Sequence, residues 1–101
     1  VVNVNKNTGS VLGLIEKPDF KDAPSNLASI GRYVLRPDIF DILRNQQPGF
    51  SSEIQLSDAI NAQAIKPNVE AIQFCGHRFD CGSIEGYVRA NLHMAELRGI
   101  L

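Results

Sequence analysis

The sequence predicts an α/β fold with a mixed sheet that contains antiparallel hairpins. Residues 1–5 and 11–16 are short apolar runs on either side of a glycine-containing turn, which is typical of a β-hairpin. Residues 69–74 and 78–80 repeat this arrangement around Gly76. Helix-start signals occur elsewhere in the chain of 101 residues, which is long enough for one small domain.

A further strand is expected over residues 28–35, which are rich in bulky β-branched and aromatic side chains. Gly31 inside this run suggests a β-bulge or a close approach of the backbone to another group. Pro18 ends the first hairpin because proline has no N–H for the ladder, and it favours an extended conformation for Lys17. Residues 19–27 follow as a loop.

Three helices are expected. Proline and aspartate begin the first, over residues 37–43, and Ser57 is placed to cap the second, over residues 58–65. Ser83 is placed to cap the third, which ends before Gly99, a typical residue just beyond a helix C-terminus. The third helix carries an apolar stripe, interpreted first as a core face, that consists of Ile84, Tyr87, Val88, Leu92 and Ala95.

Composition limits the classes of partner and the compartment. The net charge is −1 and no run of Lys or Arg occurs, which argues against nucleic acid or a membrane as the main partner. Cys75 and Cys81 form no CxxC motif and are expected to be reduced, mostly buried thiols of a cytoplasmic protein, with a disulfide as the alternative. Val1 in place of Met suggests a piece of a longer polypeptide.

Adjacent charges end the first hairpin. On an extended backbone the side chains of Glu16 and Lys17 point to opposite faces, so they are poorly placed to pair with each other. A carboxylate can accept hydrogen bonds from vicinal sugar hydroxyls, and an ammonium can neutralise a phosphate. The pair is therefore either the edge of a ligand site or a solvated strand end.

Asp80 lies just ahead of the last helix, where a carboxylate is either a cap-like group or a ligand for a hard metal ion. One carboxylate cannot hold magnesium alone. Residues 53–58 are expected to provide capping and loop hydrogen bonds. His77 and His93 are expected to be isolated surface or partly packed residues, and Phe79 is expected in the core.

Four motifs occur in order along the chain: VLGLIEKP at residues 11–18, PSNLASIGRYVL at 24–35, EIQLSDAI at 53–60 and FDCGS at 79–83. Together they resemble the C-terminal part of the bacterial UTP–glucose-1-phosphate uridylyltransferase (UDP-glucose pyrophosphorylase) family. The resemblance implies a Rossmann-like nucleotide-diphospho-sugar transferase fold. Residues 1–101 would form its C-terminal, sugar-phosphate-binding part.

The resemblance also implies a reaction and site residues. Glucose 1-phosphate would attack the α-phosphorus of UTP, giving UDP-glucose and pyrophosphate with Mg²⁺. Glu16 would bind glucose hydroxyls, and Lys17 would bind the sugar phosphate and act in catalysis. Asp80 would be a catalytic metal ligand, one of two aspartates around Mg²⁺. Ser29 would contact the sugar through its side chain or its backbone N–H.

The family's nucleotide-binding loop and first metal-binding aspartate have no counterpart in this sequence, so we expect the chain to be inactive alone. The exposed edge of a truncated sheet predicts self-association, hence a homo-oligomer. Two alternatives stay open. One is a sister sugar nucleotidyltransferase using TTP or another base, and the other is a non-catalytic binding or assembly module that uses the last helix.

Overall fold

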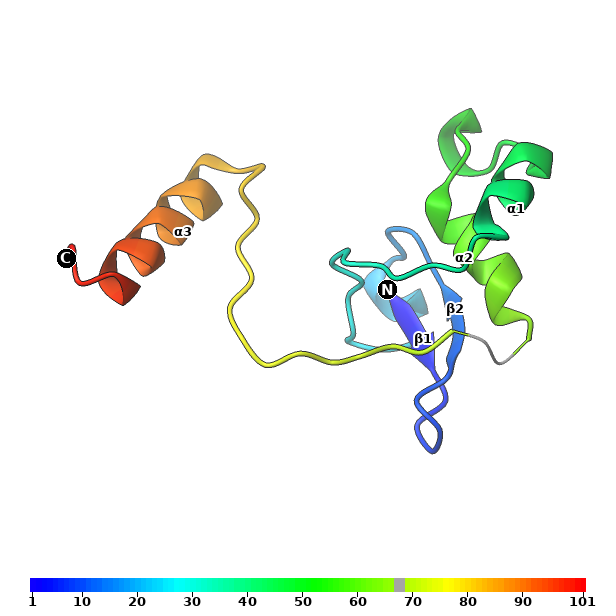
Figure 1. The fold of residues 1–101 in the computed structure, drawn as a ribbon, viewed down its shortest axis with the longest axis horizontal. Helices are drawn as coiled ribbons and strands as arrows, with labels where there is room; N and C mark the ends of the chain where they lie inside the picture. The colour runs from blue at the N-terminus through cyan, green and yellow to red at the C-terminus, as the bar shows by residue number, and fades with distance from the viewer. Residues whose placement is uncertain (67–68) are drawn as a thin grey trace.

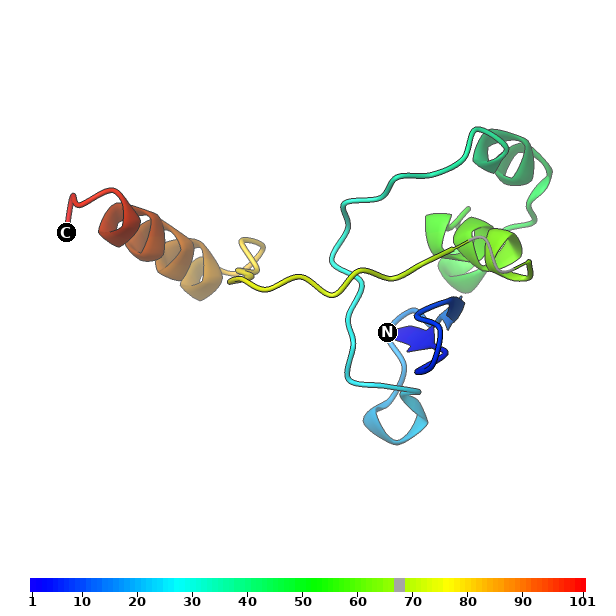
Figure 2. The ribbon, with the colours of Figure 1, turned by 60° about the horizontal axis from the view of Figure 1, so that its bottom comes forward.

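The computed structural model describes residues 1–66 and 69–101. Its elements in chain order are β1 (Val2–Val4), β2 (Val11–Leu14), a 3₁₀ turn (Phe20–Asp22), α1 (Ile39–Asn45), a second 3₁₀ turn (Phe50–Ser52), α2 (Leu56–Ala64) and α3 (Ile84–Leu97). The hairpin, α1 and α2 lie together, whereas α3 stands apart at the end of an extended segment (Figures 1 and 2). The radius of gyration is 16.5 Å, against about 13 Å for a compact chain of this length.

The first hairpin is confirmed. β1 and β2 pair antiparallel, with Val2 opposite Leu14 and an irregularity in register after Asn3. Gly9 has φ +74° in the connecting turn, a conformation that glycine adopts without steric penalty. Because β2 ends at Leu14, the chain leaves the sheet directly before Glu16. Glu16 and Lys17 therefore lie just beyond one end of the two-stranded sheet.

The predicted larger sheet is wrong in three places. Residues 28–35, 69–74 and 78–80 form no strands. The segment 28–35 turns instead, because Gly31 and Arg32 have φ values of +89° and +64°. A Cβ on Gly31 would meet no atom within 4 Å, so backbone conformation and not close approach explains this glycine.

Irregular segments flank the hairpin where further strands were expected. On the β1 side, the Val2 N–H donates to the Leu27 carbonyl at 2.9 Å. On the β2 side, the Val11 N–H donates to the Val69 carbonyl at 2.9 Å, and an isolated bridge joins Ser10 to Glu70. The α/β class and antiparallel pairing are thus confirmed. The ladder stops at two strands because the flanking segments make too few consecutive bonds.

Helix α1 begins and ends two residues later than predicted, and α2 begins two residues earlier than expected. Gln55 is the N-cap residue of α2 and makes no side-chain cap bond, so the predicted capping role of Ser57 is wrong. Ser57 lies in the first turn of the helix. The loop before α2 is held as expected by its own hydrogen bonds, including one from the Gly49 N–H to the Glu53 carbonyl at 2.9 Å.

A small core lies between α1, α2 and β2. Its buried members are Ile39, Ala59 and Ile60, and its partly buried neighbours are Leu14, Leu35, Ile42, Leu43 and Val69. The Asn61 side chain joins α2 to the end of β2, accepting from the Leu14 N–H at 2.6 Å and donating to the Leu14 carbonyl at 2.9 Å. This pair of hydrogen bonds holds the end of β2, which precedes Glu16 and Lys17.

Helix α3 follows the sequence prediction at both ends. The Ser83 hydroxyl accepts from the Gly86 N–H at 3.0 Å, and Gly99 has φ +67° beyond the helix. Within the described residues, α3 packs against no other helix or strand. Tyr87 is 59% exposed and Ile84 is 88% exposed, so the interpretation of this stripe as a core face is wrong for this chain.

Two further expectations concern thiols and membranes. Cys75 and Cys81 are free thiols, as predicted, but both are exposed, because they lie in the extended segment and the turn before α3. Across the parts of the chain that the structure describes, no helix has both the length and the apolar character that crossing a bilayer requires.

Candidate functional site

A cleft of about 400 Å³ lies at the end of the hairpin. Three of the four predicted site residues, Glu16, Lys17 and Ser29, line it together. They come from two segments that are separated along the chain. The remaining lining residues are Val1, Leu14, Ile15, Pro18, Ala28, Tyr33, Ser57 and Arg78. The cleft is thus lined by one carboxylate, two cationic side chains and three hydroxyl groups.

Lys17 has a strained backbone. Its φ is +42°, so the predicted extended conformation is wrong and the alternation of side chains no longer applies. Glu16 and Lys17 consequently line the same cleft. A left-handed conformation in a non-glycine residue costs about 1–2 kcal/mol, and such strain is concentrated at functional sites. Arg32, Ser51 and Ser52 share a positive φ, so this conformation explains how Lys17 faces the cleft and does not by itself assign a function.

Ser29 is held by a neighbour that the sequence did not identify as a site residue. The hydroxyl groups of Ser29 and Tyr33 are 2.8 Å apart, and both residues line the cleft. The turn at Gly31 and Arg32 brings them together across four positions. Sequence analysis placed Tyr33 in a strand, where residues four apart lie too far from each other for this bond.

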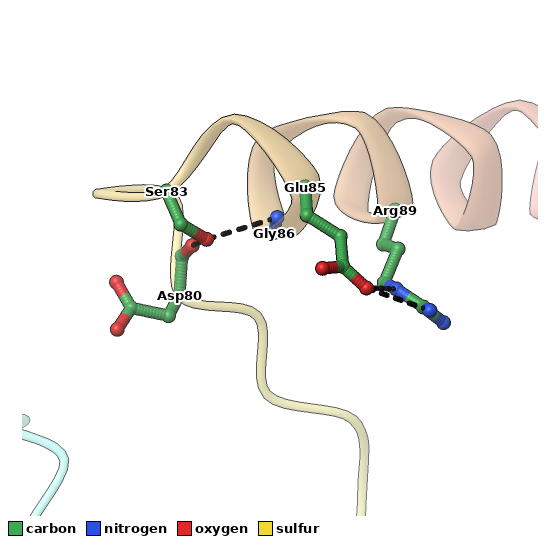
Figure 3. Close-up of polar contacts among 5 residues, drawn as sticks. All are labelled: Asp80, Ser83, Glu85, Gly86 and Arg89. Atoms are coloured by element: carbon green, nitrogen blue, oxygen red, sulfur yellow. Dashed lines mark hydrogen bonds and ion pairs between the residues drawn. The ribbon is translucent and has the colours of Figure 1, made fainter.

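Asp80 lies in a tight turn before α3 (Figure 3). One oxygen of its carboxylate, Oδ1, accepts from the Gly82 N–H at 3.1 Å. Its carbonyl accepts from the Ser83 hydroxyl at 3.1 Å. Ser83 is the N-cap of α3, and the Asp80 carboxylate makes its cap-like bond to the backbone of the turn just before that helix. Figure 3 shows this carboxylate directed away from the Glu85–Arg89 ion pair of α3.

Gly86 is required by the same turn. A Cβ at this position would overlap the Asp80 carbonyl oxygen and come within 2.9 Å of the Ser83 hydroxyl. The first turn of α3 therefore lies directly against the Asp80 backbone (Figure 3). Side chains of any other type at position 86 would displace Asp80.

The donor set for a metal ion is incomplete in this chain. In residues 1–66 and 69–101, no group of three His, Cys, Asp or Glu side chains could hold a metal ion. Asp80 is exposed, and its Oδ2 atom makes no hydrogen bond to the described residues. This geometry fits a single carboxylate that contributes to a magnesium shell completed by other groups. Asp80 does not line the cleft.

The two histidines are neighbours, contrary to expectation. The ring centroids of His77 and His93 are 4.6 Å apart, and those of Phe79 and His93 are 5.3 Å apart. Phe79 is half-buried by this contact. The cluster joins the extended segment to α3, which indicates a structural role.

A second hollow, of about 320 Å³, lies between α1 and α2. Three of its polar side chains have partners: the Arg36 guanidinium is 3.9 Å from the Asp38 carboxylate, which also accepts from the Gln63 amide at 2.8 Å. These groups are satisfied by one another, so we assign this hollow to packing between the two helices.

Comparison with known proteins assigns the chain to a family. The family model described as "Nucleotidyl transferase" matches residues 1–96. The chain belongs to the nucleotidyl transferase family. It is 54% identical over 77 residues to a UTP–glucose-1-phosphate uridylyltransferase of Pseudomonas aeruginosa, a match that covers 76% of this chain and 28% of that relative. It is 47% identical over 91 residues to the same enzyme of Mycoplasma genitalium, covering 90% of this chain and 31% of that relative.

Solved structures support the same assignment for this nucleotidyl transferase chain. It superposes with a TM-score of 0.84 and 45% identity on a UDP-glucose pyrophosphorylase complexed with UDP-glucose, a match that covers 95% of this chain and 38% of that one. The predicted resemblance to this family and its fold is thereby confirmed. The chain spans less than a third of the two curated relatives. Its placement in their C-terminal part stays a prediction.

Proposed function

We propose that this nucleotidyl transferase chain is the sugar-1-phosphate-binding part of a UTP–glucose-1-phosphate uridylyltransferase. The observation that carries the proposal is the cleft in which Glu16, Lys17 and Ser29 converge. The sequence resemblance implies the same three residues as ligands of the sugar phosphate. The identity of 45–54% to the named uridylyltransferases and pyrophosphorylase supports the choice of substrates.

The cleft matches the chemistry of a sugar phosphate. The Glu16 carboxylate would accept hydrogen bonds from vicinal hydroxyls of glucose, and the Lys17 ammonium would bind the 1-phosphate. Ser29, oriented by Tyr33, would contact the sugar. A phosphate oxygen of glucose 1-phosphate then attacks the α-phosphorus of UTP and pyrophosphate leaves. This attack needs no strong base, because positioning and electrostatic stabilisation lower most of the barrier.

Asp80 would hold Mg²⁺ through its unbonded carboxylate oxygen, together with a second aspartate outside this sequence. When bound, Mg²⁺ supplies positive charge next to the phosphates. Asp80 itself is held in place by the local turn with Gly82 and Ser83. Its carboxylate is thus oriented by hydrogen bonding within this turn.

We also propose the substrates, the compartment and the oligomeric state of the complete enzyme. The complete enzyme would use UTP and glucose 1-phosphate, would be cytoplasmic, and would form a homo-oligomer. Residues 1–101 alone would be inactive, because the uridine-binding part of such an enzyme is needed as well. Nucleic acid and membranes are not proposed as partners.

The test is UDP-glucose formation by the full-length polypeptide that carries this chain, in the presence of Mg²⁺. Lys17→Ala and Asp80→Asn should each lower kcat/KM by about 100-fold or more. Lys17→Gly removes the amine and relieves the strained backbone, so it should be as inactive as Lys17→Ala. Lys21→Ala, on the exposed 3₁₀ turn, is the matched control and should keep full activity.

Each proposed assignment can fail separately. Wild-type protein that forms no UDP-glucose would overturn the function. Full activity of Lys17→Ala or Asp80→Asn would overturn the site. Equal use of UTP and TTP would replace the uridylyl assignment with a nucleotidyltransferase of broader base specificity.

One observation favours a second function, that of an assembly module. The apolar stripe of α3 is exposed and has no partner element in the described residues. Tyr87→Ala should then abolish partner binding while UDP-glucose formation is preserved. Loss of activity together with loss of binding would assign the stripe to the folded enzyme itself.

A further inference from the structure

Arg78 reaches the cleft from a segment far along the chain from the other lining residues. It belongs to the extended segment, residues 69–80, that precedes α3, yet it lines the same cleft as Glu16, Lys17 and Ser29. Nothing in the sequence marks Arg78 as a site residue. Figure 1 shows the course of this segment, which leads away from the hairpin to α3.

The guanidinium of Arg78 has no partner among the described residues. Arg36, Arg44 and Arg89 are each within 4 Å of a carboxylate, whereas Arg78 makes no ion pair and no hydrogen bond. The Lys17 ammonium in the same cleft also makes none. The cleft therefore presents two cations without partners beside the single carboxylate of Glu16.

A neutral sugar would not require two positively charged side chains in its binding cleft, whereas a sugar phosphate would use them. A phosphate monoester carries about 1.5 to 2 negative charges near pH 7. Lys17 alone would leave roughly one of these charges without a partner in the cleft. A guanidinium is the side chain best suited to supply the second charge, because its planar fork donates two parallel hydrogen bonds to a phosphate.

We infer that Arg78 is a second binding residue for the 1-phosphate of the sugar substrate, together with Lys17 in the same cleft. The inference rests on the proposed function and adds a residue to its substrate site. The extended segment would then contribute a substrate-binding side chain to the cleft. Asp80 is two residues beyond Arg78, so the Cα atoms of the two residues lie within about 7 Å of each other.

The experiment measures KM separately for both substrates in the full-length polypeptide. Arg78→Gln should raise the KM for glucose 1-phosphate by about ten- to hundredfold and leave the KM for UTP unchanged. Arg78→Lys keeps the charge without the fork and should recover part of this loss. Arg98→Gln is the matched control, since this arginine is also without an ion pair but lies at the end of α3.

The outcomes separate this inference from the proposed function. A wild-type enzyme that makes UDP-glucose, combined with an unchanged KM in Arg78→Gln, overturns the inference alone. Equal increases in both KM values also overturn it, because they indicate a general structural role. Absence of UDP-glucose formation in the wild type overturns the proposed function first.

Discussion

The two ends of this chain are held by different kinds of interaction. In the first part, comprising β1, β2, α1 and α2, side chains far apart in the sequence meet in a core around Ile60. In the last part, residues 80–101, the side-chain hydrogen bonds of Asp80, Ser83 and the helix that follows join residues at most four positions apart. The cleft belongs to the first part and the predicted metal ligand to the second. A site that spans both thus depends on two independent sources of order.

The comparison also explains which elements the sequence could predict. Helix α3 packs on no other element, but its boundaries match the prediction because caps and periodicity are local signals. The predicted strands at residues 28–35, 69–74 and 78–80 failed, since a strand needs a neighbour along its whole length. The first hairpin succeeded because its two strands are joined by a short turn.

The largest effect should follow from a change in the core. Ile60→Ala removes a side chain that is only 3% exposed, and it should lower the free energy of unfolding by about 2–5 kcal/mol. Leu92→Ala on the exposed face of α3 is the control, and its change should stay within about 0.5 kcal/mol. Urea titration followed by circular dichroism measures both. Similar losses in the two variants would show that α3 is packed in solution.

A smaller effect should follow from breaking the connection between α2 and β2. Asn61→Ala leaves the N–H and carbonyl of Leu14 without their partners, at a cost of about 1–3 kcal/mol. It should also raise the KM for glucose 1-phosphate, because the strand end before Glu16 loses its anchor. Asn91→Ala removes a similar bond on exposed α3 and should change neither quantity. An unchanged KM in Asn61→Ala would separate the anchor from the cleft.

The smallest effect should follow from removing the cap of α3. Ser83→Ala deletes the bond to the Gly86 N–H and should reduce stability by about 1 kcal/mol, with fraying of the first helical turn. Ser57→Ala in α2 is the matched control, since no side-chain cap bond is present there. Helix content from circular dichroism distinguishes them. Equal loss in both variants would contradict the capping assignment.

The candidate site shows the same division between local and tertiary information. Glu16, Lys17, Ser29 and Asp80 came from motifs that are contiguous in sequence. Tyr33 and Arg78 were missed, because their approach to the cleft depends on a turn with positive φ and on the course of an extended segment. The left-handed backbone of Lys17 was also missed, since the following proline favours the opposite conformation.

The turn around Asp80 has a consequence for the order in which the site is assembled during folding. Asp80, Gly82, Ser83 and Gly86 interact within seven consecutive residues, whereas the anchor of the cleft joins residues 47 positions apart. Short loops close in well under a microsecond, and long ones close later and at a greater entropic cost. A full-length chain that refolds from the unfolded state would therefore form the turn around Asp80 first and the cleft beside Glu16 and Lys17 afterwards.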